Sequence, residues 1–428
     1  MKLAGRVAAA IDIITEITTR NRPTSEALRD WGKAHRFAGS TDRHVVGTLV
    51  FDTLRRKNSA AALMKDDAPR AVVLGTLSLV WKLSVSEIAS LAAEPFGPGA
   101  LTQLESATLA NPLPSGQPTF VQGDFPKWLQ PQLEAAFGDS VVSELSALAE
   151  RAPVDLRVNT LRATREEVLA TLTKFGAQTT SLSPWGIRIP APGIETRNVN
   201  VEAEPSHGLG QFEVQDEASQ IAAALTGAGP GETVLDLCAG AGGKSLALAA
   251  LMQNSGKLVA HDRDKHRLRP IFERITRAGA TNLEVVAADE SHKLNRPDGY
   301  DLVVVDAPCT GSGTWRRKPD AKWRLGEKQL QVRLNEQAKV LDQAVPLMKK
   351  GGRLAYFTCS ILPAENQDQV SAFLKRHPGF KIIPYTEQWL KTLPSAPPRS
   401  ANNRTDVLQL TPQMHRTDGF FVALLAKG

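Results

Sequence analysis

From about residue 232 onward, short apolar segments alternate with longer amphipathic ones, and this alternation limits the possible folds more than any other feature. The apolar segments have the length of buried strands, and the segments between them have the length and periodicity of helices. We therefore expect a doubly wound α/β fold with a mostly parallel sheet. The expected strands are 233–238, 257–262, 283–289, 301–308 and 353–359, the expected helices are 244–252, 264–278, 327–348 and 363–376, and a closing antiparallel hairpin is expected at 406–410 and 419–426.

The chain upstream of this alternation divides into two further regions. Residues 1–140 have helical periodicity almost throughout, and the Pro/Gly-rich stretch 95–118 within them predicts an irregular connection. Residues 141–210 mix short strands with one helix, so they predict a small α+β module, and 211–428 form the doubly wound domain. Basic residues are interleaved with the apolar ones in the first region, and they fit a solvated surface and an RNA-facing surface equally well. These residues are Arg20, Arg22, Arg36, Arg43, Arg55, Arg56 and Lys57.

Composition narrows the class of protein only slightly. The chain has 428 residues and a net charge of +6, which is weak evidence for a polyanionic partner. It lacks an apolar run long enough to span a membrane, so we expect no membrane partner. Its three cysteines, Cys238, Cys309 and Cys359, form no C-x-x-C pair, which argues against a disulfide framework and a zinc cluster. We expect a cytoplasmic monomer with no bound metal.

A glycine-rich segment, 236–245, follows the first strand of the doubly wound domain. It fits neither a P-loop nor a dinucleotide fingerprint, because Cys238 and Ser245 stand where those motifs need glycine or a small residue. Asp236 would repel a phosphate, whereas a ligand with a positive centre, such as S-adenosylmethionine, suits it. Asp262 and Asp289 end the next two strands, where carboxylates can accept hydrogen bonds from ribose hydroxyls and from the adenine edge.

The fourth and fifth strands each run into a cysteine. Cys309 and Cys359 should meet at the same edge of the sheet, where the active sites of such folds are built, whereas Cys238 is better explained as a small buried apolar residue. Two thiols beside a methyl donor suggest methylation at carbon 5 of a pyrimidine, in which a thiolate adds to carbon 6 and activates carbon 5. Asp306 could hydrogen-bond N3 of a cytosine during this attack.

These motifs resemble the RNA cytosine-5 methyltransferase family, in particular its bacterial 16S ribosomal RNA methyltransferase B type. The resemblance covers nearly the whole chain and rests on QDEASQ (215–220), LDLCAGAGGKS (235–245), DAPCTGSGTWRRKPDAKWR (306–324) and TCSILPAEN (358–366). It implies a Rossmann-like class I methyltransferase domain. This domain would follow a small α+β RNA-binding module, carried by DLRVNTL (155–161), and an all-helical NusB-like N-terminal domain, carried by residues 36–56.

The resemblance also implies roles for single residues. Cys359 would be the nucleophile and Cys309 would assist product release, although the two roles could be exchanged. The residues implied at the S-adenosylmethionine site are Cys238, Ala239, Gly240, Ala241, Gly242, Gly243, Lys244, Asp262, Asp289 and Asp306. The chain departs from the family at Ala241, where proline is usual, and at Ser245, where threonine is usual.

The residues that follow the catalytic motif suggest where RNA binds. Five cations are interleaved with Trp315 and Trp323, and their closeness to Cys309 in the sequence favours an RNA-facing role over a solvated loop. These cations are Arg316, Arg317, Lys318, Lys322 and Arg324. The implied substrate is RNA, and 16S rRNA in particular. Two alternatives stay open, an exocyclic amino methyltransferase and a non-catalytic ribosome-assembly factor built on a methyltransferase fold.

Overall fold

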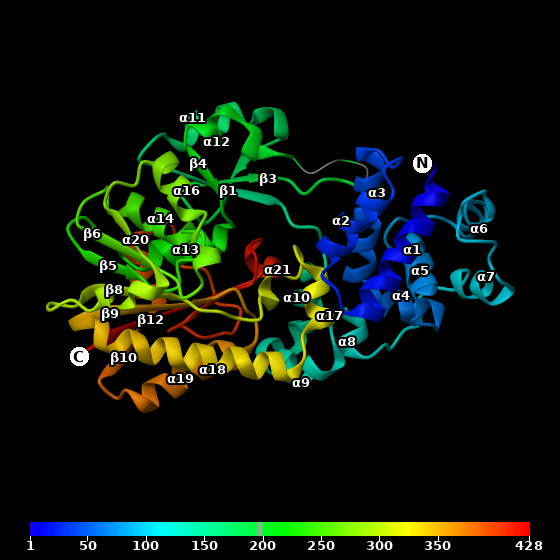
Figure 1. Cartoon of the computed structure of the whole chain (residues 1–428). Helices are drawn as coiled ribbons and strands as arrows, with labels where there is room; N and C mark the ends of the chain where they lie inside the picture. The colour runs from blue at the N-terminus through cyan, green and yellow to red at the C-terminus, as the bar shows by residue number, and fades with distance from the viewer. Residues whose placement is uncertain (195, 197–198) are drawn as a thin grey trace.

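The computed structural model describes residues 1–194, 196 and 199–428, and its ribbon forms two lobes joined by a narrower waist (Figure 1). The right-hand lobe in that view is helical, as expected. A single apolar core runs from Ala4 to Leu109 and joins its first seven helices. Those helices are α1 (Leu3–Arg20), α2 (Thr24–Ala34), α3 (Ser40–Arg55), α4 (Lys57–Met64), α5 (Pro69–Leu79), α6 (Val85–Ala93) and α7 (Gln103–Leu109).

Helix α7 lies inside the stretch that was expected to be irregular, so that expectation is wrong for residues 103–109. The helix begins at a capping box in which the Thr102 hydroxyl accepts from Glu105 N and the Glu105 carboxylate accepts from Thr102 N. The prolines of the stretch, such as Pro98 and Pro112, stand outside the helix and do not interrupt it. The Thr-x-x-Glu pattern was the sequence signal for this helix.

The helices of the waist belong to a different core. Side chains from Phe125 to Leu148 pack with Trp315, Leu330 and Ile361 of the C-terminal half. This shared core means that the end of the helical region and the C-terminal half stabilise each other. The helices of this part of the chain are α8 (Thr119–Gln122), α9 (Gln130–Phe137) and α10 (Val141–Leu148).

The small α+β module is an antiparallel sheet with strand order β2-β3-β1-β4. Its elements are β1 (Val154–Val158), β2 (Gln178–Thr179), β3 (Gly186–Ile189), β4 (Phe212–Val214), α11 (Arg165–Thr171) and α12 (Pro205–Gly208). Strand β4 begins two residues after the expected module boundary at residue 210. Leu156, Ile187 and Phe212 bring the strands together in one small core against α11.

The C-terminal half is the expected doubly wound sheet, with strand order β10-β12-β9-β8-β5-β6-β7 and β11 paired to β12. Strands β5 to β9 are parallel, whereas β12 is antiparallel to β9, β10 and β11. The closing hairpin is therefore confirmed, and β10 is a further strand that was not expected. The bounds are β5 (Thr233–Asp236), β6 (Lys257–His261), β7 (Leu283–Val286), β8 (Tyr300–Asp306), β9 (Met348–Thr358), β10 (Phe380–Ile383), β11 (Leu408–Leu410) and β12 (Phe420–Lys427).

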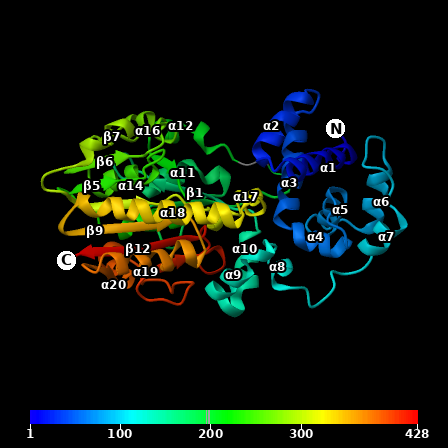
Figure 2. The ribbon, with the colours of Figure 1, turned by 60° about the horizontal axis from the view of Figure 1, so that its bottom comes forward.

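Helices cover both faces of this sheet, and Figure 2 shows α18 crossing the face opposite α14. Strand β8 explains why: Leu302 and Val304 pack into one core with α13, α14 and α20, while Val303 and Val305 pack into the other with α18 and α19. A strand that is apolar on both faces requires two layers of cover. The helices are α13 (Glu217–Leu225), α14 (Gly243–Leu251), α15 (Lys265–Leu268), α16 (Ile271–Ala278), α17 (Pro319–Arg324), α18 (Glu327–Ala344), α19 (Gln367–Arg376), α20 (Tyr385–Thr392) and α21 (Pro412–His415).

Three expected helices are shorter than their sequence pattern suggested, and the one expected at 363–376 begins, as α19, only at Gln367. The helix expected at 264–278 is divided into α15 and α16 at Pro270, whose ring cannot continue a helix. The helix expected at 327–348 ends at Ala344, and β9 already begins at Met348. Within the described residues, no helix combines the length and the apolar character needed to cross a membrane.

Candidate active site

The strand order brings the predicted site residues to one edge of the sheet. Strands β9, β8, β5 and β6 are neighbours, and the carboxyl ends of parallel strands meet at the same edge. Cys359 follows β9, Cys309 follows β8, the glycine-rich turn follows β5 and Asp262 follows β6. Loops that are well separated in the sequence therefore form one site.

The turn after β5 depends on glycine at two positions. Gly240 and Gly242 have φ of +51° and +84°, a region that other residues seldom adopt. A Cβ atom on Gly242 would also lie 2.4 Å from Ile271 Cγ1. Ala241 stands between them, and its carbonyl accepts a hydrogen bond of 2.7 Å from Arg274 Nη1. The residue that departs from the family pattern is thus held by α16.

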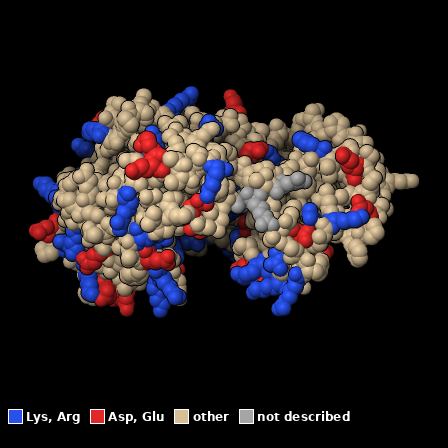
Figure 3. Space-filling view, turned by 90° about the horizontal axis from the view of Figure 1, so that it is seen from above, with Lys and Arg blue, Asp and Glu red and all other residues tan. Residues whose placement is uncertain are grey.

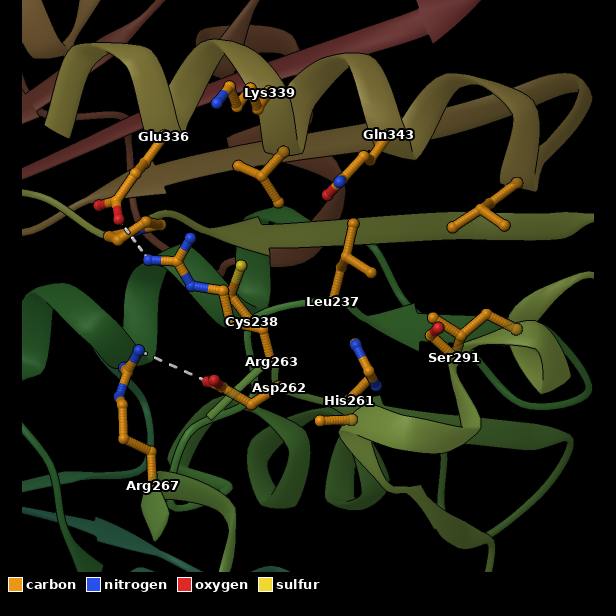
Figure 4. Close-up of a pocket in the computed structure, with 15 residues that line it drawn as sticks. Leu237, Cys238, His261, Asp262, Arg263, Arg267, Ser291, Glu336, Lys339 and Gln343 are labelled. Atoms are coloured by element: carbon orange, nitrogen blue, oxygen red, sulfur yellow. Dashed lines mark hydrogen bonds and ion pairs between the residues drawn. The ribbon is translucent and has the colours of Figure 1, made fainter. Parts of the chain in front are cut away.

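A cavity of about 410 Å³ lies between this turn, the end of β6 and helix α18 (Figure 4). Of the predicted donor-site residues, Cys238 and Asp262 line it directly. The buried Asp262 carboxylate accepts from Gly240 N and Asp264 N, each at 2.9 Å, and lies 3.5 Å from Arg267. Figure 4 also shows Arg263 paired with Glu336 of α18 across the cavity. The remaining walls mix apolar and polar side chains.

The other predicted donor-site residues lie around this cavity rather than in its wall. Asp289 is exposed on the first turn of the 3-10 helix Ala288–Leu294, while Ala288 and Ser291 of that helix line the cavity. Lys244 and Asp306 form an ion pair of 2.7 Å, and the Lys244 ammonium also lies 4.7 Å from the Phe420 ring centroid. Residues Ala239 to Gly243 form the backbone of the turn itself.

Asp236 is the buried carboxylate behind the turn. Its Oδ2 accepts from Ser245 Oγ at 2.7 Å, while its buried Oδ1 has no hydrogen-bond partner among the described residues. Burial, with a smaller contribution from the charge of Asp306, raises the pKa of Asp236 to about 7, although the Ser245 hydroxyl and Lys244 act in the opposite direction. A buried acceptor without a partner is costly unless a donor or a cation binds near it. The site therefore fits a ligand that carries positive charge.

The two catalytic candidates are in direct contact. Cys309 Sγ and Cys359 Sγ lie 3.3 Å apart, and both residues are half-buried free thiols. The hydrogen bond to Cys359 and burial together raise the pKa of the Cys309 thiol well above its ordinary value. A proton retained on Cys309 can be donated toward the Cys359 sulfur, which favours Cys359 as the sulfur that bears negative charge. The pair therefore consists of two unequal thiols.

The loops that carry the thiols are locked together by close backbone contacts. Gly313 N donates to Cys359 O at 2.9 Å, and Ser312 Oγ and Ser360 Oγ are 2.8 Å apart. A Cβ atom on Gly313 would lie 1.9 Å from Gly419 O, so only glycine fits there. Gly419, which directly precedes β12, thus packs against the loop that carries Cys309.

Sequence reasoning quoted Glu365 within a motif but gave it no role, and it did not single out Gln337. The Glu365 carboxylate is fully buried and accepts hydrogen bonds from both cysteine loops and from Gln337 of α18. The signal in the sequence was an acidic residue six positions after Cys359, next to a strand end. Such a carboxylate must find donors when it is buried.

The expectation that residues 316–324 face RNA is wrong for most of the cations. Arg316 is 5% exposed and pairs with Asp216 and Asp418, and Arg317 pairs with the same two carboxylates. Lys322 is 2% exposed and donates to Arg55 O and Asp124 O, at 3.0 and 2.5 Å.

Arg324 and the tryptophans also point inward. Arg324 pairs with Asp320, Trp315 is buried in the waist core, and Trp323 Nε1 donates to Leu54 O of α3. We call residues 315–324 the interdomain segment, because it joins the Cys309 loop to the N-terminal lobe. Lys318 is its exposed cation without an ion pair among the described residues.

A separate basic groove lies on the N-terminal lobe and continues toward the waist. It consists of two adjoining hollows that share Leu28, Arg43 and Phe51, and no Asp or Glu among the described residues lines either. Figure 3 shows Lys and Arg side chains gathered on this lobe close to the waist. The cations that line the groove are Arg29, Lys33, Arg36, Arg43, Arg55, Arg151, Arg316 and Arg317.

Three cations at the outer end of the groove lack acidic partners among the described residues, whereas Arg29 pairs with Asp30. Lys33, Arg36 and Arg43 are exposed, and within the described part of the chain none of them forms an ion pair. The Phe37 ring beside them is 74% exposed. Unpaired cations beside an accessible aromatic ring form a surface suited to a polyanion with stacked bases. The inner end lies at Arg316 and Arg317, a few residues from Cys309.

Comparison with known proteins gives consistent matches. Residues 223–426 match the family described as 16S rRNA methyltransferase RsmB/F, and residues 125–194 match a ferredoxin-like domain of RsmF/B-like methyltransferases. A probable ribosomal RNA small subunit methyltransferase B of Synechocystis sp. is 33% identical over 312 residues, covering 72% of this chain and 67% of the relative. Ribosomal RNA small subunit methyltransferase B of Shewanella oneidensis is 35% identical, covering 71% of this chain and 67% of the relative.

A solved structure has the same fold over most of the chain. It is a methyltransferase homolog protein from Pyrococcus horikoshii, with a TM-score of 0.59 and 25% sequence identity. The match covers 72% of this chain and 98% of that one. The sequence matches to the curated relatives span about two thirds of their length.

Proposed function

Because the chain belongs to the 16S rRNA methyltransferase RsmB/F family, we propose that it transfers a methyl group from S-adenosylmethionine to carbon 5 of a cytosine in 16S rRNA. The observation that carries the proposal is the contact of 3.3 Å between the sulfurs of Cys309 and Cys359 at the ends of neighbouring strands. One sulfur can bond to the cytosine ring while the other remains beside it. An exocyclic amino methyltransferase would have no use for such a pair.

The donor site in this proposal is the cavity between the glycine-rich turn and α18. Asp262 in its wall is the acceptor for the ribose hydroxyls, and the unpartnered Oδ1 of Asp236 behind the turn suits a positively charged ligand. The ion pair of Lys244 and Asp306 adjoins the turn on the side of the thiols. Bound S-adenosylmethionine would supply an electrophilic methyl group there.

Cys359 is the nucleophile in this proposal, as the resemblance to the RNA cytosine-5 methyltransferases implies, and the raised pKa of the Cys309 thiol agrees with this. The Cys359 thiolate adds to carbon 6 of the cytosine, N3 of the ring takes up a proton from solvent as negative charge develops there, and the Asp306 carboxylate accepts a hydrogen bond from that N3–H. Bound S-adenosylmethionine would supply the methyl group to carbon 5 and leave as S-adenosylhomocysteine. A base would then remove the proton from carbon 5, so that the bond between sulfur and carbon 6 breaks and N3 gives up its proton. Cys309, in contact with the departing sulfur, assists this last step.

The basic groove supports RNA as the substrate. It leads from the exposed end at Lys33 and Arg36 toward Arg317, eight residues after Cys309. A strand of RNA along its outer end would bring its phosphates past Lys33, Arg36 and Arg43, whereas Arg316 and Arg317 at the inner end are already paired with Asp216 and Asp418. On this view the N-terminal lobe and the small module hold the RNA while the C-terminal half performs the chemistry.

The experiment that tests the proposal traps the covalent step. We expect Cys309→Ala, incubated with donor and 16S rRNA, to accumulate a slowly migrating protein–RNA adduct on a denaturing gel, because attack proceeds while release is slowed. Cys359→Ser should form no adduct, since a serine hydroxyl is barely ionised near neutral pH. An adduct in Cys359→Ser alone would exchange the two roles. Methylation that survives in Cys359→Ser without any adduct would defeat the covalent mechanism.

A further inference from the structure

The Glu365 carboxylate, in the 3-10 helix Pro363–Glu365, lies at the centre of the hydrogen bonds that surround the two thiols. Its Oε1 accepts from Thr310 N at 2.8 Å and from Gln337 Nε2 at 3.0 Å. Its Oε2 accepts from Thr310 Oγ1 and Ser360 Oγ, both at 2.5 Å. No Lys, Arg or His of the described residues forms an ion pair with it, so four neutral donors solvate a fully buried negative charge.

These donors come from the residues next to the thiols. Thr310 follows Cys309, and Ser360 follows Cys359, so a single carboxylate fixes the residue after each sulfur. Gln337 also donates to Pro308 O at 3.0 Å, which fixes the residue before Cys309. Tyr356 Oη donates to the backbone carbonyl of Glu365 at 2.6 Å and fastens the main chain at this residue to β9. Glu365 therefore links the residues that flank both sulfurs, in addition to the direct contacts between the two loops.

The geometry points to Glu365 as a positioning residue that holds the two thiols in contact and assigns them different roles. This inference rests on the function proposed above. Glu365 does not contact either sulfur, and it acts through Thr310 and Ser360. Its charge adds to this positional effect, because a negative charge near Cys309 opposes loss of the proton from that thiol.

The other ionisable groups near the pair do not replace Glu365. Cys359 itself and the charge of Glu365 both raise the pKa of Cys309, while the Gly311 N–H lowers it. Asp306, at the end of β8, has its charge matched by Lys244, and the pKa of the Tyr356 phenol is raised by burial so that it stays neutral. Glu365 is thus the unmatched charge beside the two thiols.

Two substitutions separate the effect of the Glu365 charge from the effect of its side-chain length. Glu365→Gln keeps the volume, and its amide oxygen can still accept from Thr310 N and Gln337 while its NH₂ group faces two hydroxyls that can rotate. The charge is lost, and most contacts remain. Glu365→Asp keeps the charge but shortens the side chain, so the carboxylate cannot reach all four donors. The matched control is Glu144→Gln, another buried carboxylate, which lies in α10 away from the thiols.

The first measurement needs no RNA. The full-length protein is treated with iodoacetamide across a pH series, and mass spectrometry follows the alkylation of Cys309 and Cys359 separately. In Glu365→Gln we expect the pH midpoint for Cys309 to fall by about one unit, because a nearby negative charge is gone. In Glu365→Asp and Glu144→Gln the Cys309 midpoint should stay close to that of the wild type.

The second measurement is methylation of RNA under saturating donor. Both Glu365 variants should lose kcat, roughly ten- to hundred-fold, since a small displacement of a reacting group has effects of that size. Donor affinity should be unchanged, and Glu144→Gln should turn over like the wild type. Wild-type alkylation midpoints and wild-type kcat in Glu365→Gln would overturn the inference.

The two proposals fail in different ways. If the covalent mechanism is wrong, Cys309→Ala forms no RNA adduct, yet the alkylation midpoints still report on Glu365. If the role of Glu365 is wrong, the adduct forms in Cys309→Ala, but Glu365→Gln leaves the midpoints and kcat unchanged. A loss of kcat in Glu365→Gln with an unchanged Cys309 midpoint would remove the electrostatic part of the inference and leave the geometric part.

Discussion

Two sets of basic side chains, one in the interdomain segment and one at the outer end of the basic groove, differ in how their charges are matched. In the interdomain segment, Arg316 and Arg317 share the buried carboxylates of Asp216 and Asp418, and Lys322 is enclosed by carbonyl groups. At the outer end of the basic groove, Arg36 and Arg43 are exposed without ion pairs among the described residues. The first set stabilises the molecule, and the second is free to bind an external anion.

This difference shows that cations close in sequence to the Cys309 motif need not bind substrate. The interdomain segment has the denser cluster and the shorter distance to Cys309 in the sequence, yet its cations are occupied within the protein. Burying a charge is costly, so such residues must be paired, and the pairs here join the Cys309 loop to both lobes. Burial and pairing, rather than closeness in sequence, distinguish a structural cation from one that binds substrate.

The largest effect should follow from breaking the buried pairs. Arg316→Met leaves Asp216 and Asp418 with one cation in place of two, and we expect a loss of about 3–5 kcal/mol in the free energy of unfolding. Chemical denaturation followed by tryptophan fluorescence measures this change. Arg36→Met is the matched control and should stay within about 0.5 kcal/mol of the wild type. Equal losses in both variants would abolish the distinction between the two sets.

The contribution of the buried Lys322 to the free energy of unfolding should depend on pH. Burial lowers the pKa of Lys322 from 10.5 to about 7, so between these values the unfolded chain holds a proton that the folded chain lacks. The stability of the wild type relative to Lys322→Met should therefore rise with pH across this window, and be lost as the pH falls toward 7. The slope should be at most about 1.4 kcal/mol per pH unit. Denaturation curves of the two proteins from pH 7 to 10 measure it, and a constant difference would mean that Lys322 stays charged in the fold.

Substitutions of the exposed cations in the basic groove should change RNA binding and leave the stability of the fold unchanged. Arg36→Gln combined with Arg43→Gln should weaken RNA binding by about ten-fold or more near 0.1 M salt, and reduce the slope of log K against log salt by about 1.4. Filter binding at several salt concentrations measures both values. The control is Lys381→Gln with Lys391→Gln, which removes the same charge from exposed positions on β10 and α20. If the two double variants bind alike, the groove is not the path of the RNA.

The sequence predicted the C-terminal sheet and the position of the thiols, because the hydrophobic pattern locates the strands and their ends. Once β8 and β9 are recognised as neighbouring parallel strands, Cys309 and Cys359 must share an edge. The additional strand β10 escaped prediction because Phe380–Ile383 is short and lies at the edge of the sheet. Its pairing with β12 is long-range and leaves no local signal.

The donor cavity and the interdomain segment were harder to predict for a different reason. The sequence locates Asp289 after a strand, but not whether its side chain turns into the cavity, and the structure leaves it exposed. The partners of Arg316, Asp216 and Asp418, lie about 100 residues away in either direction. Local patterns contain no information about such contacts, so burial of these cations could not be read from the sequence alone.

The smallest effect on RNA binding should come from substitution of Lys318. This is the member of the interdomain segment that, like the cations at the outer end of the groove, is exposed and has no ion pair among the described residues. It precedes α17, its side chain is exposed, and it forms no ion pair within the described residues. If burial and pairing separate the two sets, Lys318→Gln should leave stability within about 0.5 kcal/mol of the wild type. It should also weaken RNA binding about five-fold near 0.1 M salt and lower the salt slope by about 0.7, as for one lost phosphate contact. Lys391→Gln is the single-charge control, and a salt slope identical to that control would mean that the whole interdomain segment, including its exposed cation, faces away from RNA.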